Sequence, residues 1–160
     1  MFVGGVLLFW VGLMGTIALG WVSPAIAANY ERALLQNADF AGKVLTDASF
    51  NRANLTNSDF NHANLRGVSF FGANLESANL EAADLSFATL DNARLVRTNL
   101  KDAVLEGAFA FNARFTGANI EGADFTDILL QQDVLDALCD RAQGINPTTG
   151  RATRDTLNCY

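Results

Sequence analysis

The chain has 160 residues, a formal net charge of −6 at neutral pH, one His and two Cys. This length fits a single small domain, and an acidic chain without a basic stripe is not expected to bind nucleic acid directly. One histidine and two cysteines far apart in sequence are too few to build a zinc site.

The first segment is apolar. Residues 2–22 contain no charged side chain, and the small-residue stretch Ser23-Pro24-Ala25-Ile26-Ala27 follows them. An apolar run that ends in an A-x-A site indicates a secretory signal peptide, so residues 1–27 are predicted to be removed by cleavage after Ala27. No Lys or Arg precedes the run, and about 20 apolar residues can span a bilayer. A retained membrane anchor through residues 2–22 and a buried hydrophobic helix are therefore the alternatives.

Residues 28–37 are predicted to form an N-terminal cap. Asn29 suits the N-cap position of a short helix, and Glu31 suits the first turn of that helix. We expect this helix to cover the start of the region that follows.

A five-residue phrase, Ala-Asn/Asp-Leu/Phe and two variable residues, recurs from Ala38 to Asp127. It makes 18 consecutive units with central residues at 40, 45 and so on to 125, of which 17 are Leu, Phe or Ile, and 14 of the residues two places earlier are Ala. A helix repeats every ~3.6 residues and a strand every ~2, so neither fits. The chain can bury all the central residues only by turning a corner once per unit, which predicts a solenoid.

This phrase resembles the pentapeptide-repeat family, whose consensus is A(D/N)LXX, over about 90 of the 160 residues. The resemblance implies an all-β solenoid over 38–130, a right-handed quadrilateral β-helix of about 4–5 coils with helical caps. Four units make one coil, and the central residue and the Ala point inward. The central residues then form four columns, and in the early coils Phe occupies two opposite columns. The corner Ala is replaced at Lys43, Ser58, Val68 and Thr98, and Lys43 suggests a frayed first coil.

Residues 131–160 are predicted to form a helical C-terminal cap. Residues 130–142 fit an amphipathic helix, and Gly144 suits its C-terminal end. A turn at 146–150 and a final helical turn at 152–158 should follow. The apolar face of the longer helix consists of Leu130, Val134, Leu135, Leu138 and Ala142.

The two cysteines are Cys139 and Cys159. An even pair in an apparently exported chain indicates a disulfide, which would tie the tail to the capping helix. Closing a loop of this length is worth roughly 3 kcal/mol in the chain-entropy model. Two free thiols and a redox-active pair are the alternatives, although the spacing is not C-x-x-C.

The signal, the solenoid and the tail together resemble a narrower group, the pentapeptide-repeat proteins of the thylakoid lumen in cyanobacteria and plants. The tail carries this resemblance through Cys139, the turn Asn146-Pro147-Thr148-Thr149-Gly150 and the ending Leu157-Asn158-Cys159. It implies a lumenal location. The residues alone indicate only export, so a periplasmic or a membrane-anchored protein stays open.

Residues typical of catalysis are nearly absent. His62 falls in an outward slot of the repeat and is interpreted as a solvent-facing spacer. No nucleophile elbow, phosphate-binding loop or dinucleotide fingerprint occurs. The recurring Asn and Asp residues are expected to satisfy backbone groups at each corner. Asn54-Leu55-Thr56 matches a glycosylation sequon by the chance of the repeat. We therefore predict no enzyme and no catalytic, cofactor-binding or metal-binding residue.

Ala110 replaces Leu or Phe at a central position. Its neighbours Phe109 and Phe111 should point outward, and Phe71 lies in the column of Phe111, two coils away, with Asp91 between them. Exposed apolar patches often mark partner sites. The alternative that we favour is that the tail or the capping helix covers these rings.

Three arginines, Arg94, Arg97 and Arg114, are predicted to cluster on one side of the later coils. This cluster is a candidate docking surface for an acidic partner segment, although a solvated face is the favoured interpretation. The following sides carry Glu106, Glu121, Asp124 and Asp127.

These observations predict a non-enzymatic exported scaffold that holds an unidentified protein partner on its flat sides; they do not predict its oligomeric state. The alternative is a cytosolic DNA mimic, because some pentapeptide-repeat proteins inhibit DNA gyrase. The export signal, the short solenoid and the cysteine pair argue against that alternative. An enzyme is the third and weakest hypothesis.

Overall fold

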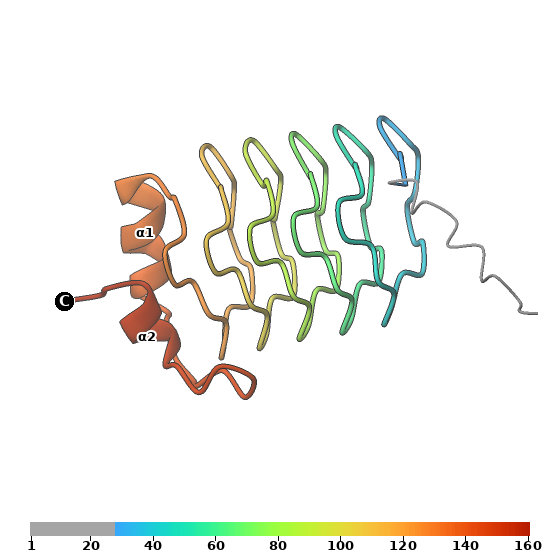
Figure 1. Ribbon diagram of the computed structural model, residues 1–160. Coiled ribbons are helices and arrows are strands. Elements are labelled where there is room, and N and C mark those ends of the chain that lie inside the picture. The colour runs from blue at the N-terminus through green and yellow to red at the C-terminus, as the bar shows by residue number, and fades with distance from the viewer. Residues whose placement is uncertain (1–27) are drawn as a thin grey trace, which may run out of the picture.

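A computed structural model describes residues 28–160 as a solenoid followed by a helical cap (Figure 1). The predicted signal segment, residues 1–27, lies outside the described residues. From Asn29 onward, every fifth residue forms a parallel one-residue bridge with the residue 20 places later, up to the pair of Phe109 with Leu129. Residues 29 to 129 span five steps of this 20-residue register, so the solenoid has five coils.

Each unit bends through a β-turn that the repeat phrase encodes. The N–H of the corner Ala donates to the carbonyl of the central residue three places earlier, as from Ala53 to Phe50 at 3.0 Å. The residue before each corner position has a positive φ, for example 57° at Arg52, before Ala53, and 63° at Gly72, before Ala73. This conformation costs about 1–2 kcal/mol for most L-residues and least for Gly, Asn and Asp. Of the 20 such positions from 32 to 127, 13 are Gly, Asn or Asp.

The recurring Asn and Asp side chains satisfy backbone groups, as predicted. The Oδ1 atom of Asp84 accepts the N–H of Ser86 at 3.0 Å, and Asp124 accepts that of Thr126 at 2.9 Å. The same contact, between residues two places apart, recurs along the solenoid at Asn29, Asp39, Asn54, Asp59, Asn64, Asn74, Asn79, Asn99 and Asn119. These residues shape the turns, so their recurrence carries no information about catalysis.

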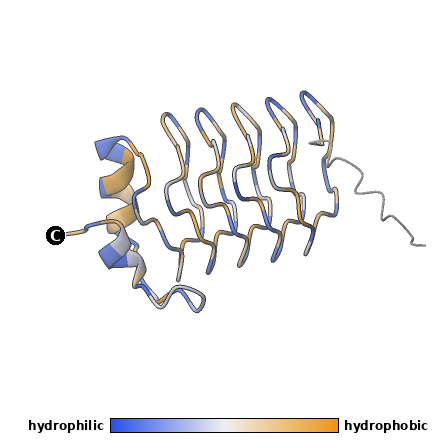
Figure 2. Ribbon diagram, in the orientation of Figure 1, coloured by the Kyte–Doolittle hydropathy of each residue, from blue (hydrophilic) through white to orange (hydrophobic). Residues whose placement is uncertain are grey.

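The core consists of the stacked central residues. Phe40 and Phe60 stack with ring centroids 4.9 Å apart, and Phe50 and Phe70 stack at 5.2 Å. The two opposite columns meet edge to face, with 5.5 Å between the rings of Phe40 and Phe50. Such offset and edge contacts are the favoured arrangements of aromatic rings. Figure 2 shows the resulting alternation of hydrophobic and hydrophilic residues along each coil.

The prediction of a capping helix within residues 28–37 is wrong, because these residues begin the first coil. Leu34 bridges to Asn54, and Arg32 and Asn37 have the positive φ of the repeat, 56° and 60°. The ring of Tyr30 extends the aromatic column. The phrase continues in register here, since Ala28-Asn29-Tyr30 and Ala33-Leu34-Leu35 precede the first unit that we recognised.

The C-terminal cap contains helix α1, Gln132–Cys139, and helix α2, Thr153–Thr156 (Figure 1). Helix α1 is shorter than the predicted 130–142: it ends at Cys139, and its C-cap residue is Asp140 rather than a residue near Gly144. Leu138 is buried, and Val134 and Leu135 are half-buried. With this apolar face, the cap closes one end of the solenoid (Figure 1). Neither α1 nor α2 has the length and apolar character that crossing a bilayer requires.

Gly144 permits a close backbone contact with Gly122 and does not end helix α1. A Cβ atom at this position would lie 2.7 Å from the backbone nitrogen of Gly122, and φ of Gly144 is 87°. The two glycines let the tail cross the last coil at close range. Beyond this crossing, a disulfide joins Cys139 to Cys159, with Cα atoms 5.5 Å apart, and links the end of α1 to the segment after α2.

Candidate functional site

Exposed aromatic side chains gather on one side of the solenoid. Phe71, Phe109 and Phe111 are 38%, 44% and 49% exposed. Phe71 and Phe111 occupy equivalent positions two coils apart, and Asp91 between them accepts the N–H of Phe111 at 2.8 Å. The favoured expectation that the tail or a capping helix covers these rings is wrong, because α1 lies against residues 113–117 on the next side of the coil.

Phe87 also belongs to this side and was missed from the sequence. It is 52% exposed and lies two residues before Thr89, which bridges to Phe109. A Cβ atom at Gly107 would lie 2.8 Å from the Phe87 ring, so the glycine in the next coil makes room for that ring. We call Phe71, Phe87, Phe109, Phe111 and the half-exposed Leu129 the aromatic face.

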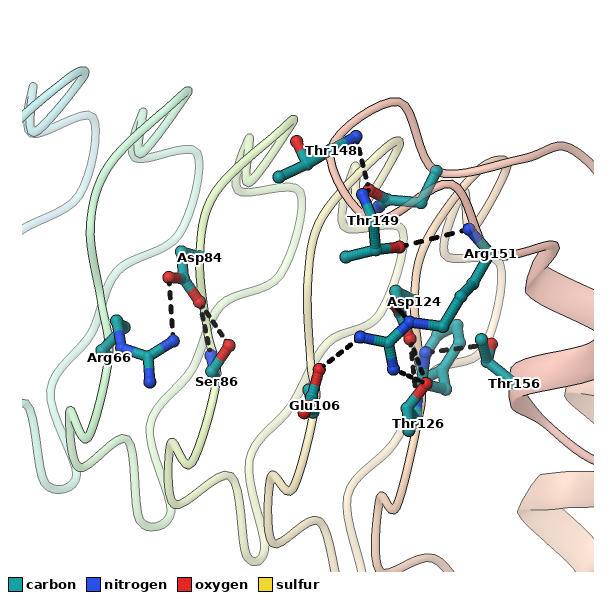
Figure 3. Close-up of polar contacts among 12 residues, drawn as sticks. Arg66, Asp84, Ser86, Glu106, Asp124, Thr126, Thr148, Thr149, Arg151 and Thr156 are labelled. Carbon is teal, nitrogen blue, oxygen red and sulfur yellow. Dashed lines mark hydrogen bonds and ion pairs between the residues drawn. The ribbon is translucent and has the colours of Figure 1, made fainter.

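Two arginines flank this face. The guanidinium carbon of Arg52 lies 5.8 Å from the ring centroid of Phe71, and that of Arg66 lies 5.3 Å from the ring of Phe87. Arg66 also pairs with Asp84 at 3.3 Å (Figure 3). Both contacts lie within the range of a cation–π interaction, which helps to hold an exposed ring in place.

The predicted arginine cluster is largely neutralised. Glu76 forms ion pairs with Arg94, at 2.6 Å, and with Arg97. The hydrogen bond from Arg94, with added attraction from both arginines, holds the pKa of the Glu76 carboxyl below its ordinary value despite partial burial. Arg114, next to Arg94 in the same column, forms no ion pair with any residue of the described part. Of the three arginines in this cluster, Arg114 alone stays available to an acidic ligand.

A polar network anchors the tail to the last coils (Figure 3). Arg151 pairs with Glu106 at 2.7 Å and lies 3.2 Å from the carboxylate of Asp124, which is fully buried. Burial raises the pKa of Asp124, but hydrogen bonds from Thr126 and Thr149 and the charge of Arg151 outweigh it, so the pKa is lowered overall. These acidic residues are used within the molecule and do not form a free acidic surface.

Asn146 closes the last coil from inside the tail. It is fully buried, and its Nδ2 atom lies 3.0 Å from the carbonyl of Asp102, 3.2 Å from that of Ala103 and 2.9 Å from that of Gly122. Its Oδ1 atom accepts the N–H groups of Thr148 and Thr149 at 2.9 and 3.0 Å. The amide thus bonds two carbonyls, of Asp102 and Gly122, that the coil-to-coil hydrogen bonds leave free, and it adds a second donor to that of Ala103, which also accepts the N–H of Asp124 at 2.9 Å.

Metal-ligating side chains do not cluster within residues 28–160. No group of three or more His, Cys, Asp and Glu residues in this range could hold a metal ion. His62 is exposed, as predicted, and its ring contacts the neighbouring Asn61 side chain. The surfaces that stand out are the aromatic face and the closed end of the solenoid.

The model of the pentapeptide repeat region matches residues 43–125, more than half of the chain. The chain belongs to the pentapeptide repeat family. Proteins of this family fold as right-handed quadrilateral β-helices, which agrees with the four-sided coils predicted above.

Solved pentapeptide repeat proteins resemble this one over most of its length. One from the thylakoid lumen of Arabidopsis thaliana is 44% identical with a TM-score of 0.80, over 81% of this chain and 90% of that chain. A second, from the cyanobacterium Cyanothece, is 28% identical with a TM-score of 0.64, over 67% of this chain and 86% of that chain.

A curated relative is similar over a shorter stretch. Thylakoid lumenal 15 kDa protein 1 of Arabidopsis thaliana is 60% identical over 38 residues, which is 24% of this chain. The match spans only 17% of that protein's own length.

Proposed function

We propose that this pentapeptide repeat protein is a non-enzymatic scaffold that binds a protein partner through its aromatic face. The observation that carries the proposal is the gathering of four exposed Phe side chains on one side of the solenoid. Apolar patches rimmed by polar residues are typical of protein interaction sites, and aromatic residues are enriched in them. Phe71, Phe87, Phe109 and Phe111 are between 38% and 52% exposed.

The solenoid suits such a role because its surface is already ordered. Every coil is joined to the next by backbone hydrogen bonds, such as Phe50 N–H to Ser69 O at 2.7 Å and Arg52 N–H to Phe71 O at 2.8 Å. A partner that docks on a rigid face avoids most of the entropy cost of ordering a flexible loop.

We further propose that the protein acts in the thylakoid lumen after cleavage at Ala27, with the Cys139–Cys159 disulfide intact. The lumenal relatives and the A-x-A site support this location. Intact-mass analysis of native protein, with and without reductant, tests it. A chain that starts at Ala28 and lacks two hydrogens supports export and oxidation. A chain that starts at Met1 with two free thiols contradicts both.

Partner capture with matched variants tests the binding surface. Phe109→Ser together with Phe111→Ser should abolish cross-linking to proteins of the native compartment. The control is Leu34→Ser with Val44→Ser, which removes apolar side chains that are 78% and 73% exposed on other sides of the solenoid. Both variants should keep cooperative melting. Equal capture by the two variants, or loss of cooperative melting in the first, contradicts the proposal.

No observation on the described residues favours the DNA-mimicking alternative. A supercoiling assay with purified gyrase addresses it directly. We expect no inhibition, and inhibition would redirect the search for a partner to the cytosol.

A further inference from the structure

A cleft of about 400 Å³ lies between α1 and the last coil. Residues 113–117 form one wall, and the other wall belongs to α1 and the turn that follows it. This volume lies within the usual range of small-ligand sites, about 300–1,000 Å³. The aromatic face lies on the preceding side of the coil, so the cleft is a separate feature. The second wall consists of Asp133, Val134, Ala137, Leu138 and Arg141.

The backbone of the last coil is unpaired at this cleft. One coil earlier, Leu95 donates its N–H to the carbonyl of Arg114 at 2.8 Å, and Arg97 donates to Thr116 at 2.9 Å. The equivalent N–H groups of Phe115 and Gly117 have no acceptor among the described residues. Helix α1 covers them but uses its own carbonyls within the helix. Two parallel donors are thus left facing the cleft.

An acceptor is open beside these donors. The carbonyl of Ala93 accepts the N–H of Arg114 at 3.0 Å, whereas the equivalent carbonyl of Ala113 receives no hydrogen bond from residues 28–160. The cleft therefore presents the groups that one coil offers to two residues of the next coil: one coil earlier, Ala93 and Leu95 pair with Arg114, and Arg97 pairs with Thr116.

A guanidinium group without a matching carboxylate lies at the same place. Arg141 donates from Nη2 to the carbonyl of Phe115 at 2.8 Å, and its enclosed Nε atom has no hydrogen-bond partner among residues 28–160. No ion pair involves Arg141 or Arg114 within the described chain. Burial lowers the pKa of Arg141, yet an arginine stays protonated at neutral pH. Arg141 is half-buried, and enclosing part of a charged group is costly unless a counter-ion reaches it.

We propose that this cleft binds the carboxylate of an N-acylated apolar amino acid, either as a free molecule or as the C-terminus of a peptide. The carboxylate oxygens accept the N–H groups of Phe115 and Gly117 and pair with Arg141. The ligand N–H donates to the carbonyl of Ala113, as the corresponding N–H of a further coil would. The apolar side chain packs against Val134, Ala137 and Leu138.

Asp133 is the one carboxylate in the lining of the cleft. Its negative charge opposes an anionic ligand and lowers the affinity. Removing the charge of Asp133 should therefore make an anionic ligand bind more tightly. A residue that only supports the fold would not have this effect.

Titration of the isotope-labelled protein with N-acetyl-leucine, followed by amide NMR, tests the site. We expect the largest shifts at the N–H groups of Phe115 and Gly117. N-acetyl-leucinamide, which has the same shape without the charge, should bind at least about tenfold more weakly, because hydrogen bonds to charged groups are worth more than that factor. Equal binding of acid and amide, or shifts that avoid these two residues, overturns the proposal.

Variants separate the ligand contacts from the stability of the cap. Arg141→Gln should weaken the binding of N-acetyl-leucine about tenfold or more. Asp133→Asn should tighten it by about two- to fivefold, the usual effect of an exposed charge pair. Ala137→Phe should fill the cleft and block binding even if Arg141→Gln does not fold. The matched control is Arg97→Gln, which removes an arginine paired with Glu76 and should leave the affinity unchanged.

Two probes distinguish the sources of the carboxylate. A six-residue peptide that ends in a free leucine carboxylate binds more tightly than N-acetyl-leucine if the cleft accepts a chain terminus, because residues before the last one then contact the coil. It binds more weakly, or not at all, if the cleft admits only a free acylated amino acid. Binding of an internal peptide segment without a terminal carboxylate contradicts both forms.

Discussion

Replacing Asn146 by Ala should destabilise the C-terminal end of the solenoid by about 4 kcal/mol. The side-chain amide has two N–H donors, which three carbonyls share at 2.9 to 3.2 Å, and one oxygen that accepts two N–H groups. Four hydrogen bonds are lost at about 1 kcal/mol each; the carbonyl of Ala103 still accepts the N–H of Asp124, but those of Asp102 and Gly122 keep no donor among residues 28–160. The change therefore leaves unsatisfied backbone inside a closed end.

Urea unfolding with hydrogen exchange measures this effect. In a solenoid, each coil is stabilised mainly by its neighbours, so the loss should begin at the cap and spread inward. Exchange of residues 113–127 should rise strongly, while that of residues 50–75 should change little. Asn146→Asp tests whether the amide donors are needed, because this change keeps the acceptor oxygen but places a carboxylate oxygen against the same three carbonyls. It should destabilise the protein at least as much as Asn146→Ala.

Thr148→Ala is the control for Asn146. Thr148 lies in the same turn and is exposed, and only its backbone N–H contacts the Asn146 side chain. A loss below about 0.5 kcal/mol is typical of such a surface change. If Asn146→Ala falls in that same range, Asn146 does not close the coil and the reasoning is wrong.

Gly144→Ala should lower the melting temperature several times more than Gly150→Ala. Both glycines have positive φ, but only at position 144 would an added Cβ lie 2.7 Å from the Gly122 nitrogen. Reducing the Cys139–Cys159 disulfide should lower the stability of the cap by roughly 3 kcal/mol in urea unfolding, whereas an unchanged midpoint would show that the bond constrains little. Asp124 has a lowered pKa when folded, so its contribution is complete above its ordinary pKa of 3.8 and is lost as pH falls through the folded value. Acid unfolding of Asp124→Asn should accordingly depend less on pH in that range.

The sequence predicts the interior of this fold well, because a five-residue period can bury every central residue only if the chain turns once per unit. Every central residue from Phe50 to Phe125 is at most 3% exposed, including Ala110, where the chain keeps its register around a small residue. At two corners a hydroxyl replaces Ala, and both find partners: Ser58 bonds the carbonyl of Leu55 at 2.6 Å, and Thr98 bonds that of Leu75 at 2.8 Å. The repeat tolerates a small polar group where a carbonyl is in reach.

The first half-coil was misassigned because a local helix signal competed with a weaker part of the repeat. Asn29 is both a good N-cap residue and a good repeat residue, since its side chain accepts the N–H of Glu31 at 2.9 Å in the repeat as well. Pairing with residues 20 places later decides between the two structures, and no local rule includes that contact.

The candidate surfaces required contacts that the sequence does not state. Their positions in the five-residue repeat predict that Phe109 and Phe111 point outward. Whether the tail covers them depends on which side of the coil α1 contacts, and the repeat does not state this. The same holds for Asn146, whose partners include Asp102, 44 residues earlier. Phe87 was missed because it occupies a variable position of the repeat that has a positive φ. An aromatic residue is unusual there, and the consensus does not predict one.

The end of a solenoid is where its chemistry can differ from that of its repeat. Each side of the last coil must satisfy the backbone groups that a further coil would pair. The Gln143 carbonyl does so at one corner by accepting the N–H of Gly122 at 2.9 Å, and the Thr156 hydroxyl does so on another side by accepting the N–H of Phe125 at 3.1 Å. Helix α1 covers a third side with side chains only, and within residues 28–160 the N–H groups of Phe115 and Gly117 and the carbonyl of Ala113 have no partner there. An extended, carboxylate-bearing ligand supplies the missing groups at that side, where Arg141 also lies, so binding there should slow hydrogen exchange of the Phe115 and Gly117 amides. A ligand that bound elsewhere on the cap would leave both exchange rates unchanged.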